Sequence, residues 1–286
     1  MDPQKHIAAI HDISCFGRCS LTAALPIISA AGIETSVIPT AVLSTHTGGF
    51  TGFTYRDLTD DIRRIVDHWT SLRLHFDAIY TGFLGSFEQI DIVSETFDRL
   101  RSDDTLVIVD PVMADNGELY PVFSKNFPSG MRGLCEKADV IVPNITEAAF
   151  MLEESYHNGP YSQEYIEGLL KRLGQICEKV VLTGVFFDDN ELGAASFDRT
   201  TEKISYSFAE RIPGYYHGTG DVFGSALTAS LVSGLPPEKA LSISVDFTAG
   251  SIRRTYDAGT DVRFGVNFEA GLEELSSEIK NAKLRS

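Results

Sequence analysis

Two glycines, a hydroxyl and a carboxylate occupy the four consecutive positions Gly218-Thr219-Gly220-Asp221, directly before a segment with the spacing of a packed helix. The first N–H groups of a helix lack intrahelical partners and carry partial positive charge, so this turn suits an anion. Glycines let the backbone approach an anion without a Cβ in the way. Asp221 would repel an anion, but beside one it can accept the proton of a hydroxyl that attacks a phosphoryl group. The turn therefore predicts a phosphoryl-transfer site with Asp221 as base.

The same four residues have a purely structural interpretation, in which the glycines form a turn and Asp221 is the N-cap of the helix. Other nucleotide motifs are missing from the sequence. It contains no G-x-x-x-x-G-K-[ST], so a nucleotide site would not be of the Walker type. It also has no G-x-G-x-x-G after its first strand-like segment, which argues against a Rossmann dehydrogenase.

Strand-like and helical patterns alternate along the whole chain. Strands are expected at 6–11, 34–43, 76–80, 105–109, 139–142 and 179–185, with a hairpin at 191–197 and 202–208. Helices are expected at 20–31, 55–74, from 86 to about 101, after Asn144, and over most of the region beyond the hairpin. This order predicts an α/β three-layer sandwich, a mostly parallel central sheet flanked by helices. No linker or repeat divides the chain, so 1–286 is expected to be a single domain.

Polar side chains gather where these strands end, and ligands of such sheets bind outside the carboxyl ends of the strands. Asp12, Thr81-Gly82-Phe83, Asp110 and Thr183 each end or follow a strand, and Asn144 and Glu147 follow another. Each also has a structural interpretation: Asp110-Pro111 as a turn, and Asn144 with Glu147 as a helix cap near the positive end of its dipole. Their common position at one edge of the sheet favours a site.

Composition excludes some classes of partner. The 286 residues carry a formal net charge of −16, which disfavours nucleic acid and anionic membranes. No apolar run reaches membrane-spanning length and no signal peptide is recognisable, so a cytoplasmic protein is expected.

Four cysteines suggest no disulfide framework. His11, Cys15 and Cys19 are spaced in fours, but strand-like residues and Gly17 disfavour the helix that a metal site there would need.

The segment GTGDVFGSAL resembles the C-terminal signature of the ribokinase-like superfamily. LSTHTGG (43–49), YTGFLGSFEQI (80–90), DPVMADNGELY (110–120) and VPNITEAAFML (142–152) resemble the pyridoxal kinase branch in order and spacing, and the resemblance extends from about residue 6 to 265. It implies ATP-dependent phosphorylation of the 5′-hydroxymethyl group of pyridoxal, pyridoxamine or pyridoxine. It also implies Mg²⁺, with a monovalent cation as an open further requirement, and a homodimer.

The resemblance also assigns roles by position. Asp221 would be the base, and the Gly218, Thr219, Gly220 and Asp221 amides the anion hole. The ATP phosphates and magnesium would be surrounded by Asp110, Asp115, Asn144 and Glu147, with Thr183 beside the nucleotide. The pyridine pocket would be lined by Ser44, His46, Thr47 and Phe83, with Asp12 at the polar edge of the substrate. The loop 44–54 would close over the ring and exclude water.

The chain departs from the family pattern at four positions: Asp12, Thr45, Phe83 and Val142 stand where serine, asparagine, tyrosine and threonine are usual. These changes leave the preferred vitamer open. Hydroxymethylpyrimidine kinase, which shares the fold, stays an alternative, although the segment IPGYYHGTGD lacks the cysteine frequent in its close relatives. A sugar kinase is disfavoured, because the G-G sugar-binding pattern is missing. A non-catalytic vitamer-binding protein is the alternative from another class, and Asp221 argues against it because binding alone needs no base.

Overall fold

A computed structural model describes residues 4–285 of the chain. Their central feature is a nine-stranded sheet with the order β11-β10-β9-β8-β5-β4-β1-β2-β3. The six strands from β9 to β2 are parallel, whereas β10, β11 and β3 are added to the two edges through antiparallel pairings. The strands are β1 (His6–Ser14), β2 (Glu34–Leu43), β3 (Tyr55–Asp57), β4 (Ala78–Thr81), β5 (Leu106–Val109), β8 (Val140–Ile141), β9 (Lys179–Val185), β10 (Glu191–Asp198) and β11 (Lys203–Glu210).

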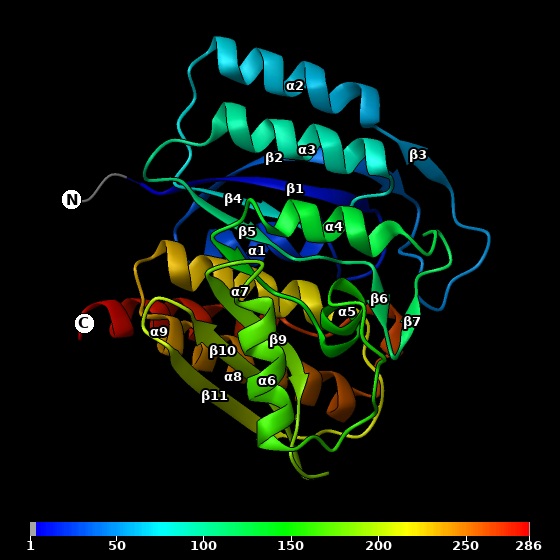
Figure 1. The fold of residues 1–286 in the computed structure, drawn as a ribbon, viewed down its shortest axis with the longest axis vertical. Coiled ribbons are helices and arrows are strands. Elements are labelled where there is room, and N and C mark those ends of the chain that lie inside the picture. The colour runs from blue at the N-terminus through cyan, green and yellow to red at the C-terminus, as the bar shows by residue number, and fades with distance from the viewer. Residues whose placement is uncertain (1–3, 286) are drawn as a thin grey trace.

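Helices cover both faces of this sheet, which gives three layers (Figure 1). One face buries its apolar side chains against α2 (Thr59–Ser71), α3 (Phe87–Leu100), α4 (Phe127–Cys135), α5 (Ile145–Met151) and α6 (Gln163–Leu173). The other packs against α1 (Leu21–Ala30), α7 (Thr219–Val232), α8 (Pro237–Ala258) and α9 (Leu272–Lys283). Short 3₁₀ turns, η1 (Val262–Phe264) and η2 (Glu269–Gly271), connect α8 to α9. The predicted α/β architecture is confirmed.

Local sequence explains several helix boundaries. The Ser86 hydroxyl accepts a hydrogen bond from the Gln89 amide and so caps α3, and Ser162 caps α6 through the Tyr165 amide in the same way. Both are N-cap arrangements that a serine before an amphipathic segment favours. At the C-terminal end of α8, Gly259 adopts a left-handed conformation with φ of 59°, which a glycine accepts without steric cost. Capping therefore fixes where these helices begin and end.

Two predicted boundaries were wrong, and one hairpin was missed. Residues 55–57, expected to begin a helix, form β3, because they pair with Ala41–Leu43 of β2. The first strand, expected to end at residue 11, continues to Ser14 through an irregular register between His11 and Ile13. A small separate hairpin of β6 (Ala114–Asp115) and β7 (Glu118–Leu119), which was not foreseen, follows the D-P-V segment. Both boundaries depend on pairing with β2, which the local pattern of either segment does not contain.

Within residues 4–285, no helix combines the length and the apolar character required to cross a membrane. All four cysteines are free thiols, and Cys15 is the exposed one. His11 lies in β1 rather than in a helix, so the i, i+4 metal arrangement that its spacing with Cys15 and Cys19 allowed does not form.

Two glycines give a matched test of packing. A Cβ on Gly193 in β10 would lie 1.9 Å from the Ser207 carbonyl oxygen of β11, whereas one on Gly133, exposed in α4, would meet nothing within 4 Å. We expect Gly193→Ala to lower the free energy of unfolding by about 2 kcal/mol or more. Gly133→Ala should raise it by about 0.5–1 kcal/mol, because alanine is the better helix former. Urea denaturation of both variants measures this, and equal effects would contradict the β10–β11 pairing.

Candidate active site

The predicted polar residues meet at the carboxyl ends of β1, β5, β8 and β9, where α7 begins. Asp12 lies near the end of β1 and Asp110 directly follows β5, while Asn144 follows β8 and Thr183 lies in β9. Asn144 and Thr183 form a parallel bridge, in which the Thr183 amide donates to the Pro143 carbonyl at 3.0 Å. The sheet therefore gathers on one edge residues that are as much as 171 positions apart in the chain.

The glycine-rich turn begins α7, with Gly218 rather than Asp221 as the N-cap. Asp221 lies in the first helical turn, so its interpretation as a capping residue was wrong. The Thr219 hydroxyl donates to the Tyr216 carbonyl at 3.3 Å, which links the turn to the segment before it. A carboxylate in the first turn of a helix lies in the positive field of the unpaired N–H groups, which stabilises its ionised form.

The two glycines of the turn have different reasons to be glycine. Gly218 has φ of 75°, and a Cβ there would lie 2.1 Å from the Arg18 carbonyl oxygen. A close contact with the chain itself thus requires a glycine at position 218. Around Gly220, a Cβ would meet nothing within 4 Å. Of the two, Gly220 is the one with open space in which a ligand could approach the backbone.

Asp221 is only partly exposed, and its surroundings raise its pKa toward neutral pH. Burial raises the pKa of Asp221 to about 7, the nearby Ser20 amide lowers it, and the negative charge of Asp12 raises it. A base is most effective when its pKa lies near the working pH. The carboxylate is therefore placed and tuned to exchange a proton near neutral pH.

Asp110 is buried, with 7% of its surface exposed. Burial raises its pKa well above the usual range, and the charges of Glu147 and Asp221 add to this. No residue between 4 and 285 donates a hydrogen bond to its carboxylate. The fully buried Tyr80 hydroxyl also has no partner there, and it lies close to Gly224, on the α7 side of the sheet. A buried carboxylate without hydrogen bonds is costly, so Asp110 is suited to a cation.

Asn144 and Glu147 form a capping box at the start of α5, which was the structural interpretation of these residues. The Asn144 Oδ1 accepts from the Glu147 amide at 2.9 Å, and Glu147 accepts from the amides of Asn144 at 2.9 Å and Met113 at 3.0 Å. Burial nevertheless raises the pKa of Glu147 to about 8. Both residues thus have a structural function, which fixes the Glu147 carboxylate at the floor of the site beside Asp110.

Asp115, the third predicted metal residue, is held by the segment before the glycine-rich turn. The Tyr215 hydroxyl donates to its Oδ2 at 2.6 Å, and the Asn116 amide donates to its Oδ1 at 2.8 Å. In the described part of the chain, no three His, Cys, Asp or Glu side chains are grouped closely enough to hold a metal ion by themselves. A metal at this site would consequently need ligands from a phosphate or water as well.

On the predicted ring-binding side, Asp12 is buried and held by two hydroxyls. Ser20 donates to its Oδ1 at 2.5 Å and Ser14 to its Oδ2 at 3.0 Å. Burial raises the pKa of Asp12, and these two hydrogen bonds oppose that rise. The Phe83 ring, half-buried beyond β4, packs against Phe123 with ring centroids 5.6 Å apart.

The loop 44–54 is closed by hydrogen bonds at its base. The Thr54 amide donates to the Ser44 hydroxyl at 2.9 Å, and the Ser44 amide donates to the Thr54 carbonyl at 3.2 Å. Thr47 is exposed on the same loop. Phe50 stacks parallel to Phe264 at 6.4 Å. The loop, expected from its composition to be polar, is thus fastened to η1 by aromatic contacts.

His46 uses both ring nitrogens within the protein. Its Nδ1 accepts from the Gly48 amide at 3.1 Å, so the proton resides on Nε2, which donates to the Arg263 carbonyl at 2.6 Å. Its ring also packs against His217 with centroids 5.3 Å apart. The predicted pocket-lining residue thus also joins the loop to the η1 segment.

Four residues of this region were not predicted from the sequence: Ser20, Phe50, Tyr215 and His217. For Tyr215 and His217 a signal was available, because aromatic and imidazole side chains directly precede the glycine-rich turn. For Ser20 there was none, since a serine before a helix is ordinarily its N-cap.

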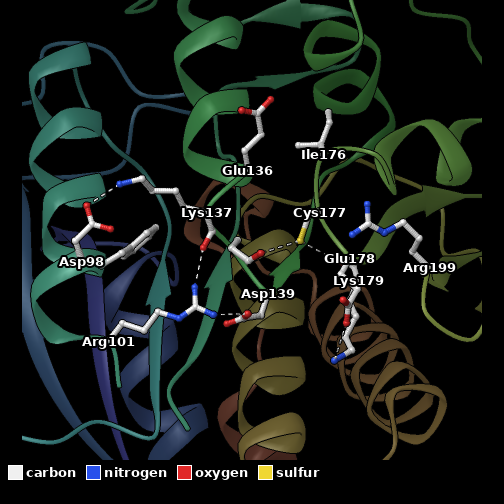
Figure 2. A pocket seen from close by; sticks show the side chains of 12 residues that line it. Asp98, Arg101, Glu136, Lys137, Asp139, Ile176, Cys177, Glu178, Lys179 and Arg199 are labelled. Carbon is white, nitrogen blue, oxygen red and sulfur yellow. Dashed lines mark hydrogen bonds and ion pairs between the residues drawn. The ribbon is translucent and has the colours of Figure 1, made fainter. Parts of the chain in front are cut away.

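A cavity of about 400 Å³ lies at the opposite end of the parallel strands from the candidate site, beside the amino ends of β8 and β9. Figure 2 shows that its charged walls pair with one another, Lys137 with Asp98 at 2.8 Å and Arg101 with Asp139 at 2.6 Å. It contains none of the predicted residues and is not the candidate site.

Comparisons with known proteins agree with this geometry. The family model described as phosphomethylpyrimidine kinase matches residues 17–265. A Bacteroides thetaiotaomicron protein, provisionally assigned as a phosphomethylpyrimidine kinase and crystallised with pyridoxal, is 39% identical with a TM-score of 0.91, over 95% of this chain and 96% of that one. Lactobacillus plantarum pyridoxal kinase is 30% identical with a TM-score of 0.88, covering 98% and 99%. A Vibrio vulnificus pyridoxal kinase is 27% identical over 90% of this chain and 87% of its own.

The two glycines of the turn make separable predictions. Gly218→Ala should lower the free energy of unfolding by about 2 kcal/mol or more, because the new Cβ meets the Arg18 carbonyl and φ is positive. Gly220→Ala, inside the first turn of α7 and facing open space, should leave stability unchanged or higher. Thermal unfolding of both variants measures the difference. An equally unstable Gly220→Ala would show that this space is not open.

Proposed function

The chain belongs to the phosphomethylpyrimidine kinase family and, within the ribokinase-like superfamily, to its pyridoxal kinases, and we propose that it transfers the γ-phosphoryl group of ATP to the 5′-hydroxymethyl group of a B6 vitamer. Its membership makes it a kinase. The product would be a 5′-phosphorylated vitamer, as in salvage of vitamin B6 to pyridoxal 5′-phosphate.

One observation carries this proposal: a carboxylate with a pKa of about 7 lies in the first turn of α7, next to open space at Gly220 and close to a second carboxylate, Asp12. A helix N-terminus attracts phosphate, and a base within its first turn can serve a hydroxyl that attacks that phosphate. Simple binding of a ring and a nucleotide requires no such base.

Groups of this site can accept the proton and stabilise the charge that the phosphoryl transfer produces. The oxygen of the 5′-hydroxymethyl group forms a bond to the γ-phosphorus as the bond from that phosphorus to the β-phosphate bridging oxygen breaks. Asp221 takes the hydroxyl proton, and ADP leaves with the electron pair of the broken bond. The amides of Gly218–Asp221 stabilise the negative charge on the transferred phosphoryl oxygens, which is the largest contribution that a preorganised site makes.

We assign the nucleotide side of the site to Asp110, Asn144, Glu147 and Thr183. Asp110 accepts no hydrogen bond between residues 4 and 285, so it fits Mg²⁺, together with phosphate oxygens and water. When bound, Mg²⁺ neutralises phosphate charge. Glu147 and Asp115 already accept hydrogen bonds from protein groups and would act through water. The capping box keeps Glu147 in place without metal.

We assign the vitamer side to Asp12, Ser44, His46, Thr47 and Phe83. Phe83 offers an aromatic face to the ring, and Asp12 offers a carboxylate to its polar edge. The loop 44–54, fastened to η1 through His46 and Phe50, would keep water from the transferring phosphoryl group. Hydroxymethylpyrimidine, a similar ring alcohol, is a second candidate substrate, because the family model is described by that activity.

A coupled ATP-consumption assay tests the proposal directly. We expect saturable turnover with pyridoxal, pyridoxamine or pyridoxine, and weaker turnover with hydroxymethylpyrimidine. Asp221→Asn keeps the size of the side chain but removes the basic oxygen, so kcat should fall by roughly 10²–10⁴ with little change in vitamer binding. In the unsubstituted chain, kcat/KM should fall as the pH is lowered through about 7, because Asp221 becomes protonated.

Three outcomes would contradict parts of this scheme. Turnover of hydroxymethylpyrimidine alone would identify the other kinase of the family. Saturable vitamer binding without ATP consumption would favour a binding protein. An Asp221→Asn variant within a few-fold of the original activity would mean that the proton leaves by another route.

Asp12 stands where relatives usually have serine, and its charge predicts a preference. A carboxylate pairs with the cationic amine of pyridoxamine but not with the aldehyde of pyridoxal, so Asp12→Ser should lower the ratio of kcat/KM for pyridoxamine to that for pyridoxal. An exposed or partly exposed ion pair is worth roughly 0.2–1 kcal/mol and a buried one more, so a change of about threefold or more is expected. An unchanged ratio removes the idea; KM for ATP is the control.

A further inference from the structure

Ser20, immediately before α1, has a backbone conformation that serines rarely adopt. Its φ is 50° and its ψ is −134°. Positive φ brings the Cβ of an L-residue too close to the backbone, and this combination with strongly negative ψ is one that glycine alone accepts easily. Such strain persists only where the surroundings impose it, and it concentrates at functional sites.

Ser20 also breaks a second local rule. As the residue before α1 it occupies the N-cap position, yet its hydroxyl makes no capping hydrogen bond to the helix. The hydroxyl instead donates to Oδ1 of Asp12 at 2.5 Å, while Ser14 donates to the other oxygen at 3.0 Å. The helix thus loses its cap, and the buried Asp12 carboxylate gains a hydrogen bond.

The backbone of Ser20 faces the other carboxylate. Its amide lies close enough to Asp221 to lower the pKa of that group, against the larger effect of burial. The hydroxyl of Ser20 thus bonds to Asp12, and its amide lowers the pKa of Asp221.

The preceding residues hold Ser20 in this position. The Arg18 carbonyl fills the space that a Cβ on Gly218 would take, at 2.1 Å. On its other side Arg18 pairs with Gly265, and its amide donates to the Phe264 carbonyl at 3.0 Å. The segment 17–20 is thus enclosed between the glycine-rich turn and η1, which supplies the constraint that the strained conformation requires.

We infer that Ser20 is a positioning residue for the kinase reaction, whose hydroxyl, held in place by a strained backbone, sets the position of the vitamer-contacting Asp12 beside the base Asp221. The effect of Ser20 on catalysis rests on the proposed function, whereas the backbone strain at Ser20 is a property of the fold. Among the described residues 4–285, the other non-glycine residues with positive φ are Arg73, Asn116, Glu153 and Glu202, and none of them donates a side-chain hydrogen bond to a carboxylate of the site. Ser20 is the one among them that does.

Two substitutions of Ser20 separate the effect of its backbone strain from the effect of its hydroxyl group. Ser20→Ala and Ser20→Gly both remove the hydroxyl, but glycine alone relieves the strain. We expect Ser20→Gly to have a higher denaturation midpoint than Ser20→Ala, although glycine gains more entropy on unfolding. Both variants should lose on the order of 10–100-fold in kcat/KM for the vitamer, with KM for ATP within about twofold of the original. Calorimetric titration with pyridoxamine in the absence of ATP should show weakened binding in both.

Glu202→Gly is the matched control, since Glu202 has φ of 54° in the exposed turn between β10 and β11. It should change the denaturation midpoint without changing kcat/KM. Recovery of activity in Ser20→Gly but not in Ser20→Ala would overturn the inference, because activity would then follow folding alone. Equal midpoints for the two Ser20 variants would overturn the strain. If the unsubstituted chain turned over no vitamer, the proposed function would fail, while the order of midpoints would still decide whether Ser20 is strained.

Discussion

Burial of carboxylates at one edge of the sheet is the constraint on which the rest of this structure depends. Asp12, Asp110 and Glu147 are 4%, 7% and 3% exposed, and Asp221 lies beside them. Burial raises the pKa of each of them. Several buried negative charges repel one another unless they are protonated or compensated. The edge is therefore suited to ligands that bring positive charge, or that meet the amides at the start of α7.

Different parts of the chain compensate different carboxylates. Glu147 accepts two backbone amides and so belongs to the architecture of α5. Asp12 is held by two hydroxyls, whereas Asp221 lies in the first turn of its own helix, where the Ser20 amide lowers its pKa. Asp110 differs from them, because no group in residues 4–285 donates a hydrogen bond to its carboxylate. Four carboxylates thus acquire separate environments through their neighbours.

The site is also a junction of segments far apart in sequence. The segment 17–20, the loop 44–54, the glycine-rich turn and η1 contact one another through Arg18, His46 and Gly218. These contacts involve main-chain atoms, so the loops cannot shift independently without losing hydrogen bonds. Precise placement of a base next to a phosphoryl acceptor demands such rigidity.

The sequence alone determined the alternation of strands and helices, and with it a parallel sheet whose carboxyl ends carry Asp110, Asn144 and Thr183, because periodicity and turn residues act locally. It also identified the glycine-rich turn with Asp221, since a helix start beside a carboxylate needs no distant partner. Tertiary structure alone decided that Gly218 is required by the Arg18 carbonyl, that residues 55–57 pair as a strand, and that Ser20 donates to Asp12 instead of capping α1. The reason is physical: each of these depends on an atom that lies close in space and far away along the chain.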